Sequence, residues 1–267
     1  MTGVPGTDGG PPSVALVTGA ARGIGAAVVR RFVARGCQVH AVDACRGGDD
    51  GTAYALATRS DLDALVAEAP GQVHPHVADV RRPEELAAVV AVVREQHGRL
   101  DAVVAGAAVI EGGAALWDTE PGVLERLWAT DVVGVWNTAQ ATVPVLLEAG
   151  GPASFVAITS AAGERGLWHL SAYCTVKHAV VGLVRGLAAD LRGTDVWVAG
   201  VAPGSTDTEM LAATAELYGL PVSELLSSTP IGRVLEPDEV ARVVELAAFA
   251  GPVVHGSILA ADGGFGQ

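Results

Sequence analysis

A glycine-rich turn between an apolar segment and an amphipathic one constrains the fold more than any other feature of the chain. Residues Val14–Thr18 form a short apolar run, VALVT, and the sequence TGAARGIG follows at 18–25. Apolar residues then recur at helical spacing at Ile24, Val28 and Phe32. A buried strand, a tight glycine turn and a helix in this order are typical of the first unit of a nucleotide-binding α/β fold.

The rest of the chain repeats this alternation of apolar strands and amphipathic helices. Further strands are predicted at 38–42, 73–77, 102–105, 154–158, 196–201 and 257–260. Helices are predicted at 24–35, 61–69, 83–97, 119–147 (interrupted near Pro144), 170–191 and 237–248. Alternating elements imply right-handed crossovers between parallel strands. The sequence therefore predicts an α/β Rossmann fold, a doubly wound parallel sheet of about seven strands in a single domain.

The length and composition fit one such domain at 13–267. The chain has 267 residues, half of them hydrophobic, enough for a large core. Residues 1–12 are rich in glycine and proline and are expected to be a flexible lead-in. Two segments break the alternation: an insert at 44–60 and an irregular stretch at 206–229, expected to be a substrate loop. Both follow strands, and α/β sheets bind ligands at the carboxyl ends of their strands.

Charge and cysteine content exclude several functional classes. Lys and Arg number 17 against 30 Asp and Glu, a net charge of -13, which argues against nucleic acid or an anionic membrane as partner. No apolar run reaches the roughly 18 residues that span a bilayer. The first residues lack the basic start of a signal peptide. The three cysteines show no metal-ligand spacing, so we expect no metal and a reducing, cytoplasmic setting.

Acidic residues after two strands favour a particular dinucleotide. In the turn, Gly19 permits the tight bend, and Gly23 and Gly25 let a pyrophosphate approach the helix N-terminus. Asp43 ends the second strand, where a carboxylate can accept hydrogen bonds from ribose hydroxyls and repel a 2′-phosphate. Asp79, after the third strand, is placed to bond an adenine amino group. These features favour NAD over NADP. The plainer alternatives are that Asp43 is a solvated acid at the end of its strand and that Asp79 belongs to the start of a helix.

A tyrosine, a lysine and a serine form the candidate catalytic group. Tyr173 and Lys177 lie four residues apart in a predicted helix, so they share a face. Tyrosine has an ordinary pKa of about 10, and a nearby ammonium stabilises its phenolate. Ser160 ends the fifth strand, where its hydroxyl can bond the same substrate oxygen. Taken alone, the pair would be an ordinary surface pair; with Ser160 and the glycine turn it predicts acid–base catalysis.

In these residues the chain resembles the classical short-chain dehydrogenase/reductase family over almost its whole length. The matching motifs are TGAARGIG at 18–25, ADV at 78–80, Ser160, YCTVK at 173–177, APG at 202–204 and ADGGF at 261–265. The resemblance implies an NAD(P)-dependent oxidoreductase in which Tyr173 is the acid/base, Lys177 binds the nicotinamide ribose and Ser160 orients the substrate. The cofactor-binding residues it implies are Gly19, Arg22, Gly23, Ile24, Gly25, Asp43, Asp79, Val80, Ala105, Gly106, Tyr173, Lys177, Pro203, Gly204, Thr206 and Thr208.

The chain is similar, more narrowly, to the mycofactocin-coupled branch of that family. The segments that carry this similarity are 56–66, 103–113, 166–191 and 203–220, together with the insert after the second strand. The resemblance implies a nicotinamide cofactor that stays bound and is reoxidised by mycofactocin, a peptide-derived redox cofactor. We expect the insert at 44–60 to cover the nucleotide, because it follows Asp43 directly.

Two positions depart from the family pattern. The usual Asn-Asn-Ala-Gly after the fourth strand is replaced by Ala105-Gly106-Ala107-Ala108, so the amides that brace that loop are absent. The usual asparagine of the middle helix is replaced by Asp131. An aspartate there could relay protons or pair with Lys177, which puts the family's water chain in doubt. Alternatively, Asp131 merely packs or faces a subunit interface.

The remaining expectations concern substrate and assembly. The residues expected at the substrate site are Trp168, His169, Met210, Leu211 and Tyr218. Their mixture suggests a largely apolar alcohol or ketone with one reacting oxygen. The alternatives are a conventional ketoreductase with exchangeable NAD(P)H and a catalytically retired nucleotide-sensing or scaffold protein. The apolar helices at 123–147 and 170–191 permit the homotetramers, or homodimers, common in the family.

Overall fold

The computed structural model describes residues 13–48, 52, 54–221 and 230–265, so the predicted lead-in at 1–12 lies outside them. Seven parallel strands form one sheet in the order β3-β2-β1-β4-β5-β6-β7. Their bounds are β1 Val14–Thr18, β2 Gln38–Asp43, β3 Val73–Val77, β4 Ala102–Ala105, β5 Ala153–Ile158, β6 Val196–Pro203 and β7 Ile258–Ala261. The predicted doubly wound α/β fold is confirmed.

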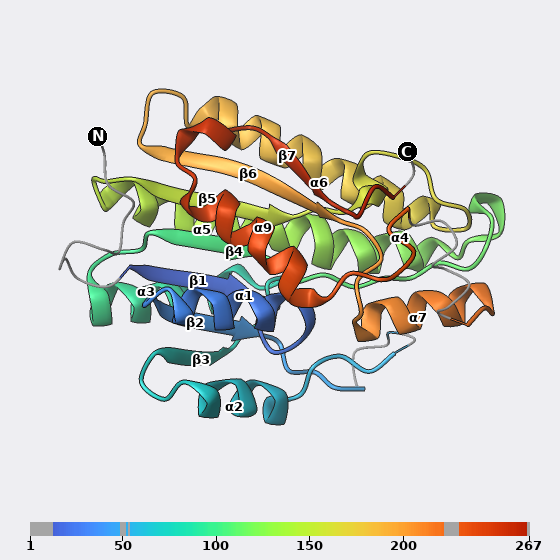
Figure 1. The fold of residues 1–267 in the computed structure, drawn as a ribbon, viewed down its shortest axis with the longest axis horizontal. Helices are drawn as coiled ribbons and strands as arrows, with labels where there is room; N and C mark the ends of the chain where they lie inside the picture. The colour runs from blue at the N-terminus through green and yellow to red at the C-terminus, as the bar shows by residue number, and fades with distance from the viewer. Residues whose placement is uncertain (1–12, 49–51, 53, 222–229, 266–267) are drawn as a thin grey trace.

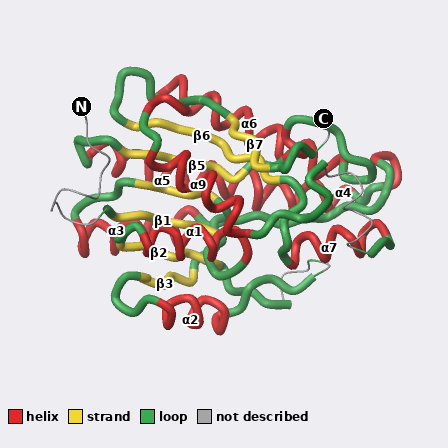
Figure 2. Tube along the Cα trace, in the orientation of Figure 1, coloured by secondary structure: helices red, strands yellow, loops and turns green. Residues whose placement is uncertain are grey.

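Helices cover both faces of the sheet (Figure 1). One face carries α1 (Gly23–Ala34), α2 (Arg59–Glu68) and α9 (Pro237–Phe249), and α1 packs directly on α9. The other carries α3 (Pro83–His97), α5 (Gly134–Glu148) and α6 (Ser171–Asp190). Figure 2 shows α7 (Glu209–Tyr218) beyond the sheet, within the predicted substrate-loop segment. Among the described residues, no helix is long and apolar enough to cross a membrane.

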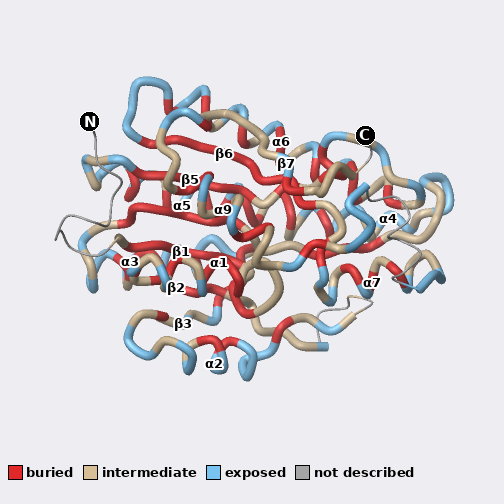
Figure 3. The backbone as a smooth tube through the Cα atoms, in the orientation of Figure 1, coloured by how far each residue is buried: buried red, intermediate tan, exposed pale blue. Residues whose placement is uncertain are grey.

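The strands are the most deeply buried part of the molecule (Figure 3). Every residue of β1, β4 and β6 is buried, as expected for central strands covered on both faces. In the outer strand β3, which has a neighbour on one side only, Val73 alone is buried and the residues after it alternate between half-buried and exposed. The inner strands are therefore held in place by packing on both faces, so their carboxyl ends are suited to position the side chains of a binding site.

The middle helix differs from the prediction of one helix at 119–147. It begins with a short 3-10 turn, η1 (Leu116–Asp118), and continues as α4 (Pro121–Leu127), the π-helical segment η2 (Trp128–Val133) and α5. The predicted interruption near Pro144 is wrong, because α5 runs through this residue to Glu148. A π segment inserts an extra residue into the helical turn and re-aims its side chains. Asp131 lies within this segment and is buried.

Candidate active site

A cavity of about 530 Å³ opens at the carboxyl ends of the strands. It extends from the glycine turn and Asp43 to Ser160 and Tyr173, so one space joins the two predicted halves of the site. The predicted site residues that line it are Gly19, Arg22, Gly23, Ile24, Gly25, Asp43, Asp79, Val80, Gly106, Ser160, Trp168, Tyr173, Lys177, Pro203, Gly204, Thr206, Thr208, Met210, Leu211 and Tyr218. Ala105, Asp131 and His169 are not among the lining residues.

The glycine turn is shaped by close backbone contacts. Gly19 has φ +67°, a left-handed conformation that other residues rarely adopt. A Cβ at Gly25 would lie 2.0 Å from the carbonyl oxygen of Gly19, and one at Gly19 would lie 2.7 Å from the Ala107 backbone. Only glycine fits these positions, so the turn keeps the start of α1 open toward the cavity. Such a helix N-terminus is a ready site for a phosphate.

Asp43 and Asp79 are held in fixed orientations at one end of the cavity. The Asp43 carboxylate accepts hydrogen bonds from the amides of Ala21 (3.1 Å) and Cys45 (3.0 Å). Asp79 pairs with Arg46 at 2.7 Å and Arg81 at 2.8 Å. Burial raises the pKa of Asp79, but these arginines outweigh it and bring the pKa down to about 2. Sequence reasoning missed both arginines, because nothing in their spacing points to Asp79.

The insert after β2 contributes to the wall of the cavity. Tyr54, Leu56 and Ala57 are among its lining residues. Arg22 of the glycine turn donates a hydrogen bond to the carbonyl of Ala55 at 2.7 Å. The insert is therefore tied to the glycine turn itself.

Other groups replace the asparagines missing from the loop after β4. The Thr18 hydroxyl accepts hydrogen bonds from the amides of Gly106 (3.1 Å) and Ala107 (3.3 Å). Asp131 accepts one from the amide of Val109 at 2.9 Å, and the Tyr54 hydroxyl accepts one from that of Ile110 at 3.3 Å. The loop thus has its own braces, drawn from β1, the π segment and the insert.

The structure brings the predicted catalytic side chains together at the inner end of the cavity. Ser160 follows β5, while Tyr173 and Lys177 lie one turn apart on α6, with Lys177 Nζ 5.5 Å from the centre of the Tyr173 ring. Burial raises the pKa of the Tyr173 phenol. The Lys177 charge opposes this rise, the Asp131 charge adds to it, and a hydrogen bond with Ser160 opposes it. The groups around the Tyr173 phenol therefore set its proton affinity.

Asp131 forms a buried ion pair with Lys177. The distance from Asp131 Oδ2 to Lys177 Nζ is 3.0 Å, and neither side chain is more than 3% exposed. Burial alone would lower the pKa of Lys177, but the Asp131 and Tyr173 charges outweigh it and raise the pKa above its usual value. Of the roles left open by the sequence, pairing with Lys177 is the one that the geometry supports.

Aromatic residues form the outer rim on the substrate side. The Tyr218 hydroxyl of α7 donates a hydrogen bond to the carbonyl of Trp168 at 2.8 Å. The Trp168 indole is stacked on His169, with ring centres 3.5 Å apart, and it is 69% exposed. His169 therefore supports the rim rather than lining the cavity. Further apolar residues complete the wall of the cavity: Leu167 and Leu170, which the sequence places at the substrate rim, and Ile110, Leu220 and Phe265, which it does not.

The comparison with protein families decides the assignment of this site. Residues 19–266, which include the turn, the serine, the tyrosine and the lysine, match the family model described as enoyl-(acyl carrier protein) reductase. The chain belongs to the short-chain dehydrogenase/reductase family. Membership fits the seven-stranded parallel sheet and the order of the motifs along the chain.

Relatives within the short-chain dehydrogenase/reductase family span most of the chain. An uncharacterized NAD-dependent oxidoreductase of Mycobacterium tuberculosis is 37% identical over 76% of this chain and 74% of its own. Cis-4-hydroxycyclohexanecarboxylate dehydrogenase of Sinomonas cyclohexanicum is 33% identical over 94% of this chain and 96% of its own. Carveol dehydrogenase of Mycobacterium avium, solved with NAD, has a TM-score of 0.86 at 29% identity, covering 94% of this chain and 96% of that one.

The residues of the cavity fit a nicotinamide dinucleotide. The open glycine turn, the bare backbone at Gly106 and Gly204 and the cavity that joins them to Tyr173 leave an extended path at the strand ends. A Cβ at Gly106 would lie 2.9 Å from the Thr18 carbonyl, and one at Gly204 would lie 2.8 Å from that of Asp262. Glycine is therefore required at both positions, because the backbone of a neighbouring segment fills the space that a Cβ would need.

Proposed function

We propose that this protein is an NAD-dependent oxidoreductase that interconverts a secondary alcohol and a ketone, or an alcohol and an aldehyde, on a largely apolar small molecule. The observation that carries the proposal is the single cavity that joins the glycine turn and Asp43 to Ser160, Tyr173 and Lys177. The alcohol dehydrogenases among its relatives support the reaction class.

Each residue of the proposed site has a distinct task. When bound, NAD supplies the hydride acceptor at C4 of its nicotinamide ring. In oxidation, the Tyr173 phenolate takes the hydroxyl proton of the alcohol as its C–H hydride leaves; in reduction, the phenol returns that proton to the carbonyl oxygen. Ser160 holds the same oxygen by a hydrogen bond, and Lys177 keeps a positive charge beside the phenolate. The apolar rim excludes water from the reacting carbon.

NAD, rather than NADP, is the cofactor that we propose. Asp43 is oriented by two backbone amides at the cavity's end, where its charge would meet a 2′-phosphate unfavourably. Asp79, with its depressed pKa, adds a second negative charge at this end. The arginines beside it are engaged by that carboxylate.

We further propose that the bound NAD does not exchange and is reoxidised in place by mycofactocin. The support is the insert, which lines the cavity and is tied to the glycine turn through Arg22 and to the loop after β4 through Tyr54. Such a cover slows the release of the nucleotide and makes an external electron acceptor necessary. The competing function is a conventional ketoreductase that exchanges free NAD(P)H.

The proposal also includes a cytoplasmic location and assembly as a homotetramer, with neither nucleic acid nor membrane as partner. The acidic composition, with a net charge of -13, supports the exclusion of those partners.

The deciding experiment is to denature the purified protein and identify the nucleotide it releases. One NAD(H) per chain supports both the NAD assignment and the non-exchanging cofactor. Protein that releases none, yet turns over alcohols steadily with free NAD, establishes the conventional dehydrogenase instead. A Tyr173→Phe variant that retains full turnover would contradict the catalytic assignment altogether.

A further inference from the structure

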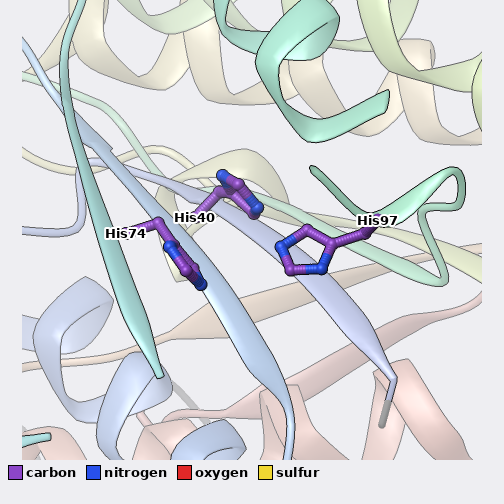
Figure 4. A group of neighbouring side chains, drawn as sticks. All are labelled: His40, His74 and His97. Carbon is purple, nitrogen blue, oxygen red and sulfur yellow. The ribbon is translucent and has the colours of Figure 1, made fainter. Parts of the chain in front are cut away.

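Four of the seven histidines of the chain meet at the β3 edge of the sheet, away from the candidate active site. His40 lies on β2, opposite His74 of β3 in the strand register, and His76 follows on the same face of β3. His97 is the last residue of α3, which covers this face. Figure 4 shows the His97 ring turned toward the two strand residues. None of the four lines the cavity of the candidate active site.

The rings of His40, His74 and His97 are close enough to share one ion. One nitrogen from each ring lies within 4.8 Å of the other two. A zinc ion with bonds of about 2.1 Å at tetrahedral angles holds its ligand nitrogens about 3.4 Å apart. The rings therefore need to close by no more than about 1.4 Å, which small side-chain rotations achieve.

Two of the three rings carry a nitrogen that has nothing to bind. His40 is completely buried, and neither its Nε2 nor the buried Nε2 of His97 has a hydrogen-bond partner among the described residues. An unpartnered buried nitrogen is costly, because it has lost water without gaining a bond. A metal ion between the rings would satisfy both nitrogens at once.

Neighbouring groups orient the rings for this purpose. His40 Nδ1 lies 2.8 Å from His76 Nε2, so a proton shared there leaves the lone pair of His40 on its free Nε2. His74 Nε2 lies 2.8 Å from the side-chain oxygen of Gln38, and this hydrogen bond orients the His74 ring.

We propose that His40, His74 and His97 form a binding site for one divalent transition-metal ion, with zinc the best match, and that His76 orients His40 through its second nitrogen. Neutral imidazoles are favoured ligands of zinc, copper and nickel, and do not select calcium or magnesium. His74 and His97 are half-buried, so the ion reaches the site from the sheet edge and keeps solvent as its fourth ligand.

The proposed ion is structural. It joins β2 and β3 to the end of α3, and so fastens the edge of the sheet to the helix that covers it. A ligand that binds only the folded state stabilises it in proportion to the logarithm of its concentration above Kd. Metal binding should therefore raise the unfolding temperature without being required for oxidoreductase turnover.

The test uses tag-free protein stripped with a chelator and titrated with zinc by calorimetry and native mass spectrometry. We expect one ion per chain and a higher unfolding temperature in its presence. His97→Gln should weaken binding at least tenfold, because it removes a ligand at the helix end while leaving the sheet intact. His76→Gln should weaken it less, since it removes only the group that orients His40.

The matched control is His178→Gln, at an exposed histidine of α6 outside the cluster, which should bind zinc as the unchanged protein does. Cobalt, titrated in parallel, should give a visible spectrum that disappears in His97→Gln. The proposal is overturned if the unchanged protein takes up no zinc in a saturable way, or if His97→Gln and His178→Gln bind it equally well. Both variants can be checked for folding by circular dichroism before titration.

Discussion

Asp131 changes the electrostatics of the catalytic lysine. A neutral asparagine at this position would leave the Lys177 ammonium facing the Tyr173 phenol alone, whereas here a buried carboxylate lies 3.0 Å from Nζ. The same carboxylate braces Val109 in the loop after β4. One residue therefore links the lysine charge, the proton affinity of the tyrosine and the shape of the loop.

Asp131→Asn should shift the pH profile of alcohol oxidation toward lower pH. Oxidation needs the Tyr173 phenolate, so kcat/KM rises with pH through the apparent pKa of the phenol. The Asp131 charge raises that pKa, and its removal also leaves the opposing Lys177 charge unbalanced. Both effects lower the pKa of the phenol. The measurement is kcat/KM at pH values from about 6 to about 10, the range over which we expect the protein to stay folded.

Both Asp131→Asn and Asp131→Ala remove the charge that pairs with Lys177, but asparagine keeps a side-chain oxygen that accepts from the Val109 amide. Asp131→Asn should therefore fold, whereas Asp131→Ala, which loses that bond too, should lose roughly 3 kcal/mol or more of stability. An unchanged or upward-shifted profile in the folded Asp131→Asn protein would show that the carboxylate does not act on the tyrosine.

Gly25→Ala should abolish tight nucleotide binding. The new methyl group would lie 2.0 Å from the Gly19 carbonyl, so the turn must move where it meets the pyrophosphate. We expect NADH affinity, measured by fluorescence titration, to fall at least tenfold. Gly151→Ala is the matched control, because a Cβ there meets nothing within 4 Å. Equal affinities in the two variants would place the nucleotide elsewhere.

At the scale of elements, the insert after β2 is the feature that distinguishes this site. Tyr54→Ala should speed the release of bound nucleotide at least tenfold, because it removes both a side chain that lines the cavity and the hydrogen bond to the Ile110 amide. Tyr54→Phe should release it at an intermediate rate, since the ring remains while the amide loses its partner. The measurement is displacement of bound NADH by excess NAD in a stopped-flow fluorimeter. Identical rates in all three proteins would show that the insert is no cover.

The alternation of elements could be predicted from sequence because most strands are apolar runs and most helices begin or end near a proline or glycine. Pro83 begins α3, and Gly98 ends it in a left-handed conformation. The π segment could not be predicted, because no local sequence signal marks it; its Asp131 pairs with Lys177, a residue far along the chain. Pro144 misled the prediction: its missing amide proton costs one hydrogen bond, and the packing of α5 tolerates that loss.

Most of the residues that line the cavity could be predicted from the sequence, because they lie in local motifs at strand ends. What the sequence could not provide is the partner of each group. Thr18 bracing the loop after β4 and Arg46 pairing with Asp79 depend on tertiary contacts between distant segments. The same holds for the histidine cluster: the strand register places His40 beside His74, and the end of α3 brings His97 to them.

At the scale of the whole molecule, large apolar side chains remain on the outside of the middle helix. Trp136 of α5 is 61% exposed, and Trp128 of the π segment and Leu147 of α5 are each 44% exposed. On α6, Gly182 and Gly186 lie four residues apart on the exposed side, where a Cβ would meet nothing within 4 Å. Bulky side chains on one helix and a bare strip on another suit the packing of a second copy of the chain.

Trp136→Lys should therefore separate the proposed homotetramer into smaller species. A lysine at this position would have to lose its hydration on entering an apolar contact, whereas in a free subunit it would stay in water. Light scattering after size exclusion should show the mass of the unchanged protein near four chains and that of the variant reduced to two or one. Val77→Lys, at a half-exposed valine that ends β3, is the matched control and should keep the larger mass. If the unchanged protein already elutes as a monomer, or if Trp136→Lys keeps the mass of four chains, this face is not the interface, and the exposed tryptophans must be explained by some other contact.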